Sequence, residues 1–357
     1  SSLQLEATAM AELKLGIDLH NRASVFMPEQ GFDYGINRLV DLAVMCEELG
    51  FYSASVGDSL LSKPRWRSIP TMTAMAAKTS KIRITSHILM PHLYNNPILL
   101  AQELATLDEL SKGRLTLGCG IGAGKSDLVA LEHDLCGVPR KRRGKAFDEM
   151  LTVLKRLWTE EEVTHHGEFW NFDDVNIGFK PRQQDPHPPL WVAAGTYLSS
   201  SGTGNFGTTE HESDKVGFKL APAPKDRVAR LADGWLTNHC TPEELKASLK
   251  EIRQIAVDKY GRSPDALKCI YCTGVYVSSD LDAAHEDVQW FQDNYHAMKI
   301  PKDTVKRWNI FGDPDECIKQ MMPFAEAGVD VFNICVRGRD PFKRTEDIAK
   351  YILPAFS

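Results

Sequence analysis

Apolar and polar positions along the chain follow two alternating periods. Residues 13–19 alternate with a period of two, which is typical of a half-buried strand. Residues 34–49 repeat apolar side chains at helical spacing, and Gly50 follows where a helix C-cap favours glycine. The same alternation predicts eight strands with helices between them, at residues 13–19, 51–56, 81–89, 114–118, 190–194, 234–237, 267–277 and 330–336.

This order of elements predicts an α/β fold with a parallel sheet covered by helices. An open doubly wound sheet shares the alternation, but the count of eight favours a closed (β/α)8 TIM barrel. We expect one domain over residues 13–357, preceded by an N-terminal leader at residues 1–12. Two long segments, residues 159–189 and 197–224, are interpreted as insertions after strands 4 and 5, and we expect them to determine substrate choice.

Composition narrows the possible partners. The 357 residues carry 42 basic and 48 acidic side chains, a net charge of −6, so nucleic acid is not expected as a partner. No apolar run approaches the ~20 residues that span a bilayer, so no membrane association is expected. The eight cysteines are scattered, as in a cytoplasmic protein with reduced thiols. Cys269 and Cys272 have CxxC spacing, but on a strand they point to opposite faces, and no metal site is expected.

In a barrel the active site lies where the strands end, so the residues after each predicted strand are the candidates for chemistry. Three histidines, His20, His87 and His239, occupy such positions and are candidate acid–base groups. A glycine run at residues 118–124 is suited either to phosphate contacts through backbone N–H groups or simply to a sharp turn. Gly195 and Thr196 are equally compatible with anion binding and with a helix N-cap.

Several motifs resemble the bacterial-luciferase-like superfamily over nearly the whole chain from Leu13. They are the opening strand at residues 13–16, the helix and strand at residues 96–107 and 113–118, and the closing segments at residues 312–316 and 327–330. Within the superfamily, residues 38–44, 53–58, 93–97 and 306–308 are most similar to the deazaflavin (coenzyme F420)-dependent glucose-6-phosphate dehydrogenase group. The resemblance implies hydride transfer between the deazaflavin and a small-molecule substrate.

The resemblance also implies roles for individual residues. Asp58 would contact the deazaflavin, and Ser86–His87 would form a non-prolyl cis peptide beneath its ring. The phosphate side of the cofactor would lie against Gly120, Gly122, Gly124, Ala194, Gly195 and Thr196. Substrate would be bound by Trp66, Asn238 and Arg307, the last as a phosphate ligand. By analogy with the family, a homodimer is expected.

The chain departs from the family at two catalytic positions. The usual histidine falls at Ser59 and the usual glutamate near Ala123, so His20, His87 and His239 remain the candidates for managing the substrate proton. Two alternatives therefore stay open beside the F420-dependent oxidoreductase. One is a two-component monooxygenase that uses reduced FMN, and the other is a degenerate barrel that binds a ligand without turnover.

Overall fold

Eight parallel strands form a closed barrel at the centre of the molecule. In the computed structural model, which describes residues 13–27, 35–122, 124, 126–198 and 217–356, these strands are hydrogen-bonded in a ring, because β10 pairs with β11 as well as with β7. The barrel strands are β1 (Lys14–Asp18), β2 (Ser53–Val56), β3 (Arg83–Leu89), β4 (Leu115–Cys119), β7 (Leu190–Ala193), β10 (Gly234–Asn238), β11 (Lys268–Val277) and β13 (Val331–Cys335). The predicted TIM barrel and its eight strands are confirmed.

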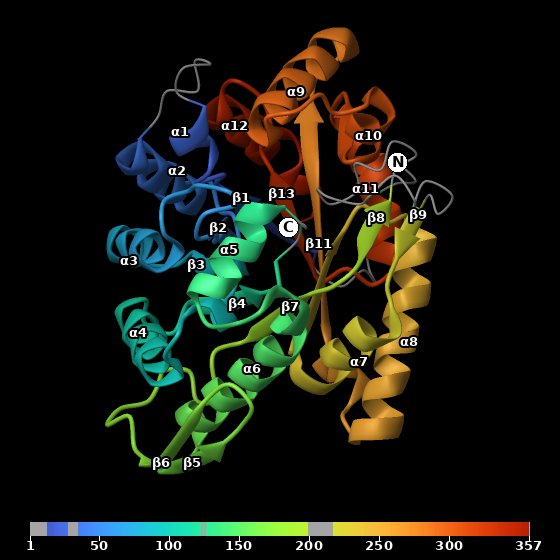
Figure 1. Cartoon of the computed structure of the whole chain (residues 1–357). Helices are drawn as coiled ribbons and strands as arrows, with labels where there is room; N and C mark the ends of the chain where they lie inside the picture. The colour runs from blue at the N-terminus through green and yellow to red at the C-terminus, as the bar shows by residue number, and fades with distance from the viewer. Residues whose placement is uncertain (1–12, 28–34, 123, 125, 199–216, 357) are drawn as a thin grey trace.

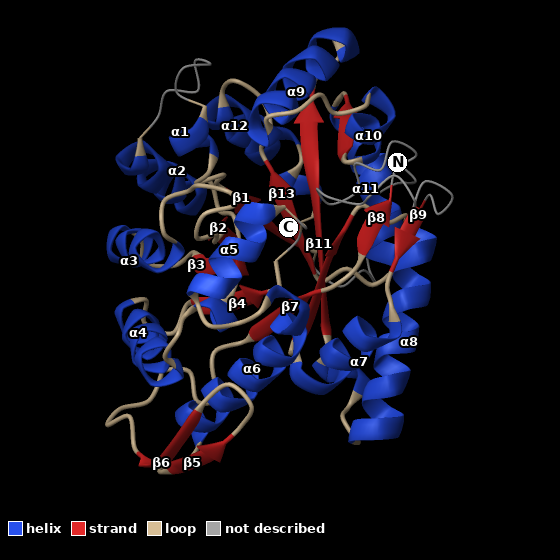
Figure 2. Ribbon diagram, in the orientation of Figure 1, coloured by secondary structure: helices blue, strands red, loops and turns tan. Residues whose placement is uncertain are grey.

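Helices surround the strands on the outside (Figures 1 and 2). The helices between successive barrel strands are α2 (Ile36–Glu48), α3 (Ser68–Lys78), α4 (Pro97–Leu110), α6 (Arg143–Thr159), α7 (Pro222–Leu231), α8 (Pro242–Tyr260) and α11 (Pro314–Glu326), with α12 (Pro341–Tyr351) after β13. Shorter or additional helices occupy the loops that follow strands, namely α1 (Ala23–Phe26), α5 (Asp127–Leu135), α9 (Leu281–His296) and α10 (Lys302–Arg307). Gly50 has a φ of 88°, the left-handed conformation expected after α2.

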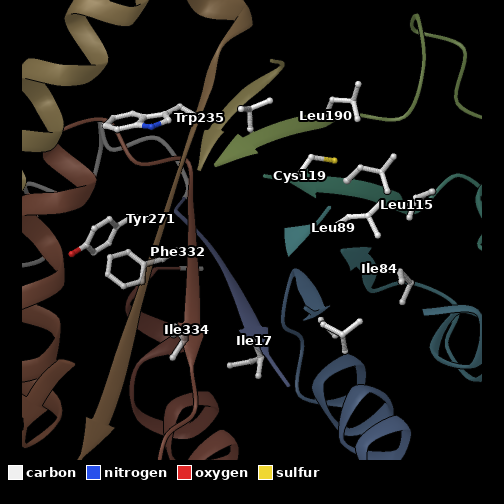
Figure 3. Close-up of a cluster of buried hydrophobic side chains, with 14 of the residues drawn as sticks. Ile17, Ile84, Leu89, Leu115, Cys119, Leu190, Trp235, Tyr271, Phe332 and Ile334 are labelled. Atoms are coloured by element: carbon white, nitrogen blue, oxygen red, sulfur yellow. The ribbon is translucent and has the colours of Figure 1, made fainter. Parts of the chain in front are cut away.

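The two-residue period of the strands divides the side chains between the helix layer and the barrel interior. Ile17, Phe332 and Ile334 are buried in the hydrophobic core drawn in Figure 3, and apolar side chains of this size each stabilise a fold by about 1.5–3 kcal/mol. Their neighbours Asp18 and Cys335 line the cavity described below. A second buried cluster of Trp191, Leu236, Ile270 and Val331 is contributed by four different barrel strands.

Strand β11 is ten residues long and extends past its barrel neighbours. Its first half pairs with β10 and β13, and its last four residues pair with the additional strand β12 (Asn309–Gly312). β12 was not predicted, because its apolar centre is only Ile310 and Phe311. The extension places Trp308 and Asn309 beside the mouth of the barrel.

We expected both long segments to shape the substrate site, but the first of them lies far from the carboxyl ends of the strands. Residues 159–189 carry an antiparallel hairpin, β5 (Val163–His166) and β6 (Asn171–Val175), which Figure 1 shows at the end of the molecule opposite α9. The arrow of β11 points toward α9 (Figure 2), so this hairpin lies far from the carboxyl end of that strand. Most of the second segment, residues 199–216, lies outside the described residues; its flanks form β8 (Thr196–Leu198) and β9 (Gly217–Lys219). The proposed leader, residues 1–12, also lies outside them.

None of the helices in the described ranges is both long and apolar enough to cross a membrane.

Candidate active site

A cavity of about 250 Å³ opens where the barrel strands end. Its lining includes His20, His87 and His239, together with Asp58 and Asn238. The structure therefore brings the three candidate histidines to one place, although they are up to 219 positions apart in the chain. This is the arrangement expected if all three follow parallel strands.

Asp18, the last residue of β1, lies between two of these histidines. Its Oδ2 is 3.5 Å from Nδ1 of His20 and 3.4 Å from Nδ1 of His87. Burial raises the pKa of the Asp18 carboxyl, but the charges of His20, His87 and Arg65 and a hydrogen bond from His87 outweigh it and lower the pKa to about 2. Asp18 is therefore a fixed negative charge in the cavity.

His87 is held from two sides. Nδ1 faces the Asp18 carboxylate, and the Asn333 side-chain amide lies 3.1 Å from the same nitrogen. Burial lowers the pKa of His87, but the hydrogen bond to Asp18 and its negative charge prevail and raise it. Because Nδ1 carries the proton that faces the Asp18 carboxylate, Nε2 is the nitrogen left to meet a ligand.

His20 is buried with an unusual backbone conformation. Its φ is 51°, in the left-handed region that non-glycine residues rarely adopt. The ring lies against Phe291 and Tyr295, with centroid distances of 5.1 and 5.5 Å. Burial lowers its pKa to about 4, despite the opposing charge of Asp18. Neither ring nitrogen makes a hydrogen bond to any residue in the described part of the chain.

The third histidine, His239, follows β10 and stacks on Trp308, with ring centroids 4.5 Å apart. Burial, and then the charges of Arg337 and Arg307, lower its pKa well below the usual value. Arg307 donates to the backbone carbonyl oxygen of His239 at 3.1 Å and to Glu244 Oε2 at 2.9 Å. Arg307 is not among the described lining residues, so the structure does not place it as the substrate-phosphate ligand that the resemblance implies.

The non-prolyl cis peptide lies between His87 and Ile88, one bond later than expected. The prediction of a cis bond at Ser86–His87 was wrong by one residue, because β3 and β4 remain in register through His87 and the irregularity falls between His87 and Leu89. Ser86 is fully buried, and its hydroxyl donates to the carbonyl oxygen of Gly118 at 2.9 Å. Ile88, the residue at the irregularity, lines the cavity.

Asp58 lines the cavity after β2, as predicted, and its carboxylate is fixed by two neighbours. Arg67 Nη1 lies 2.9 Å from Oδ1, and the Tyr94 hydroxyl donates to Oδ2 at 3.2 Å. Burial first, and then the Asp58 charge, raise the pKa of Tyr94, so the hydroxyl keeps its proton. Asp58 is thus a preformed acceptor rather than a freely rotating side chain.

Trp66 does not line this cavity. The residue is 38% exposed, and its carbonyl oxygen accepts a hydrogen bond from Asn21 Nδ2 at 2.7 Å. Asn238, in contrast, is among the lining residues. Of the three residues assigned to substrate, the structure therefore places only Asn238 at the cavity wall.

The glycines expected at the phosphate side of a cofactor divide into two groups. Gly122 lines the cavity with a φ of 72°, and a Cβ there would lie 2.6 Å from Met90 Sδ. Gly120 instead makes room for Ile88, because a Cβ would lie 2.3 Å from Ile88 Cδ1. Gly124 and, after β7, Ala194 and Gly195 are not among the described lining residues. Thr196 begins β8, and Ala123 lies outside the described residues.

Sequence reasoning missed two thiols in the lining, Cys272 and Cys335. Their sulfur atoms are 3.2 Å apart, and Cys335 Sγ lies 3.7 Å from Asp18 Oδ2. The hydrogen bond to Cys335 and burial raise the pKa of Cys272 well above its usual value. Cys269 does not line the cavity, which agrees with its predicted orientation to the other face of β11. The two-residue period of β13 was the available signal for Cys335.

The fold and cavity define a TIM-barrel protein with a ligand site at the carboxyl ends of its strands. The model of the luciferase-like monooxygenase family matches residues 14–201, so the chain belongs to that family. An F420-dependent glucose-6-phosphate dehydrogenase of Amycolatopsis mediterranei (strain U-32) is 25% identical, with 90% of this chain and 95% of that protein covered.

Two solved structures share the fold. An F420-dependent secondary alcohol dehydrogenase in complex with an F420-acetone adduct has a TM-score of 0.73 at 20% identity, covering 97% of this chain and 99% of that chain. The monooxygenase RslO1 from Streptomyces bottropensis also has a TM-score of 0.73, at 19% identity, covering 97% of this chain and 100% of that chain. The barrel is therefore shared by dehydrogenases and monooxygenases.

Proposed function

We propose that this protein is a coenzyme F420-dependent oxidoreductase that transfers a hydride to or from a small organic substrate. The observation that carries the proposal is the cavity itself, which combines a wall at Ile88, a fixed carboxylate at Asp58 and the paired Asp18 and His87. Relatives whose alignments cover 90% of this chain are named F420-dependent glucose-6-phosphate dehydrogenases, which supports this cofactor.

The residues present fit a planar cofactor. Ile88, Met90 and Val129 supply an apolar wall, and Gly122 leaves the space beside Met90 that a Cβ would fill. Asp58 would accept a hydrogen bond from the edge of the ring, held in place by Arg67 and Tyr94. When bound, F420 accepts or donates a hydride at the deazaflavin C5. On the phosphate side we retain Gly120, Gly124, Ala194, Gly195 and Thr196 as proposed contacts.

His87 is the group we assign to the substrate proton. An alcohol that gives up a hydride must also lose its hydroxyl proton, and a positioned histidine accelerates such a transfer by about 10²–10⁴-fold. Asp18 holds the protonated Nδ1, so Nε2 takes the proton in oxidation and returns it in reduction. His20 and His239 are the alternative acid–base groups, and their substitution tests the assignment.

The substrate we propose is an alcohol or carbonyl compound without a phosphate group. Arg307 is paired with Glu244, and the Thr241 hydroxyl accepts from the Glu244 backbone N–H in the N-terminal capping box of α8. Of the three residues that the resemblance assigns to substrate, Arg307 therefore serves the start of α8. Asn238 remains the residue of this group that is available at the cavity wall.

Titration of the purified protein with F420 and, separately, with FMN tests the proposal. We expect one F420 to bind per chain, followed by a change in deazaflavin absorbance that depends on an alcohol or ketone from a broad panel. Binding of FMN without F420 would contradict the proposal and favour the two-component monooxygenase. Cofactor binding with no turnover across the panel would favour the degenerate barrel.

The proposal also covers the cellular compartment and the oligomeric state of the protein. All eight cysteines are free thiols, which supports a reducing compartment and hence the cytoplasm. We further propose that the protein forms a homodimer. Its other partner would be a small-molecule substrate, and we expect no nucleic acid to bind. Light scattering on the purified protein tests the dimer, and a mass of one chain would contradict it.

A further inference from the structure

We propose that the cavity also contains a binding site for a divalent cation of the zinc class, with Asp18, His20 and Cys335 as its ligands. The three side chains offer a carboxylate oxygen, an imidazole nitrogen and a sulfur, all within 4.8 Å of one another. Such a mixed N, O and S set is the donor chemistry that Zn²⁺ takes in proteins. The site shares Asp18 with the contact to His87, but the binding of the cation can be tested without F420.

The topology of the barrel explains why the sequence carries no metal-binding motif. Asp18 and Cys335 are separated by 317 positions, but they are direct partners in the register of the neighbouring strands β1 and β13. His20 then follows Asp18 by two residues, in the turn that the left-handed conformation at φ 51° produces. Our sequence-based expectation of no metal site rested on local spacing, which cannot reveal ligands from opposite ends of the chain.

Two of the three ligand–ligand distances are close to those around a tetrahedral ion. Zinc lies about 2.0–2.1 Å from nitrogen or oxygen and about 2.3 Å from sulfur, so pairs of tetrahedral ligands are roughly 3.3–3.6 Å apart. Asp18 Oδ2 is 3.5 Å from His20 Nδ1 and 3.7 Å from Cys335 Sγ. These two distances therefore need shifts of only a few tenths of an ångström, and the distance from the His20 ring nitrogen to Cys335 Sγ is no more than 4.8 Å.

His20 provides a second, independent indication of a ligand. It is 6% exposed and lines the cavity, yet both of its ring nitrogens lack a hydrogen-bond partner among the described residues. Buried polar groups are nearly always satisfied, and an orphaned one calls for a water, an ion or a ligand. A cation at this position satisfies one ring nitrogen directly.

The charges around the site favour a thiophilic ion over a hard one. The Asp18 carboxylate and a Cys335 thiolate together neutralise a divalent cation, so the ion adds no net positive charge beside the guanidinium groups of Arg337 and Arg65. The Cys272 thiol, 3.2 Å from Cys335 Sγ, supports that thiolate by a hydrogen bond. Mg²⁺ and Ca²⁺ prefer oxygen ligands, so they fit this set poorly. Three protein ligands leave one tetrahedral position for water or a substrate oxygen.

Metal binding to the full chain, stripped by chelation and studied without F420, tests the site. We expect equilibrium dialysis to give one Zn²⁺ per chain and no saturable binding of Mg²⁺. With Co²⁺ in place of Zn²⁺, we expect the thiolate-to-cobalt charge-transfer absorption together with the visible bands of a tetrahedral ion. No zinc retained by the wild-type chain, or a cobalt spectrum without the thiolate band, would overturn the proposal whatever the outcome of the F420 titration.

Variants assign the ligands. Asp18→Asn, His20→Ala and Cys335→Ser should each weaken Zn²⁺ binding by more than the ~10–100-fold that loss of an outer hydrogen-bond partner costs. Cys272→Ser keeps a hydrogen-bond donor beside Cys335, so its Zn²⁺ affinity should fall by no more than about 10–100-fold. The matched control is Cys136→Ser, because Cys136 is a free thiol outside the cavity lining. Full affinity in Cys335→Ser would contradict the assignment even if the other variants fail to fold.

Discussion

Asp18 Oδ2 and His87 Nδ1 lie 3.4 Å apart, although they belong to β1 and β3, with β2 between those strands in the barrel. The contact exists because both side chains point into the barrel at its carboxyl end. A carboxylate that faces one nitrogen of an imidazole fixes the ring orientation and raises its proton affinity. His87 is thereby oriented to present Nε2 to a substrate.

Removing the imidazole should affect turnover rather than cofactor binding. In His87→Gln we expect kcat to fall by about 10²–10⁴-fold, the usual contribution of general acid–base catalysis, while the cofactor Kd changes little. His166→Gln is the control, because the His166 side chain is 64% exposed on the distant hairpin. Steady-state kinetics and cofactor titration check the prediction. An unchanged kcat would remove His87 from the proton step and leave His20 and His239.

The Asp58 carboxylate should contribute to cofactor affinity. We expect Asp58→Asn to weaken cofactor binding by roughly 10-fold, since a charged hydrogen bond contributes about 1.5–3 kcal/mol. Tyr94→Phe leaves the carboxylate in place and removes only one of its supports, so its effect should be smaller. Fluorescence titration gives the affinities, and circular dichroism verifies the fold. Equal affinity in wild type and Asp58→Asn would place the ring elsewhere.

Two glycines with the same backbone conformation distinguish the effect of backbone strain from the effect of a filled cavity. Gly122 and Gly137 have φ values of 72° and 68°, but a Cβ at Gly122 would lie 2.6 Å from Met90 Sδ, whereas nothing lies within 4 Å at Gly137. Alanine at either site should cost about 1–2 kcal/mol of stability from the left-handed backbone. Only Gly122→Ala should also weaken cofactor binding. Equal cofactor affinities in the two variants would exclude Gly122 from the cofactor site.

His92 should make the protein sensitive to acid. Burial, and then the charges of His133, Arg143 and Arg227, lower its pKa to about 3, whereas the unfolded chain has a value near 6.5. Below pH 6.5 the unfolded state therefore binds a proton that the folded state refuses, and stability falls with pH. His92→Phe should reduce the loss of unfolding free energy between pH 7 and pH 5 by about 2 kcal/mol.

Urea unfolding of wild type and variant at the two pH values gives this difference. His166→Phe serves as the control, because it makes the same substitution at an exposed histidine on the hairpin. An identical fall in stability for wild type and His92→Phe would show that His92 is protonated freely in the folded state.

Much of the fold was predictable because the strands and helices obey simple periods. The β1 segment alternates Leu15, Ile17 and their polar neighbours, and α8 is framed by the Thr241–Glu244 capping box and a left-handed Gly261. Strand β12 escaped prediction because it adds to the extended half of β11 rather than to the barrel, so two apolar residues suffice. The β5–β6 hairpin escaped because its strands are largely exposed and polar.

The site was predictable in part. Positions that follow strands converge in a barrel, so His20, His87 and His239 were found from the sequence, and the family resemblance added Asp58. Arg307 and Trp66 were assigned by resemblance, but their contacts depend on partners such as Glu244 and Asn21 that no local pattern reveals. Cys335 was missed because its contact with Asp18 joins the last barrel strand to the first.

A crystal structure of the protein with F420 bound tests the central claim most directly. We expect the deazaflavin to lie in the cavity against Ile88, with its edge within hydrogen-bond distance of Asp58 and with His87 Nε2 facing the substrate side. A deazaflavin bound away from Ile88 and Asp58, or density for FMN alone after exposure to both cofactors, would contradict it.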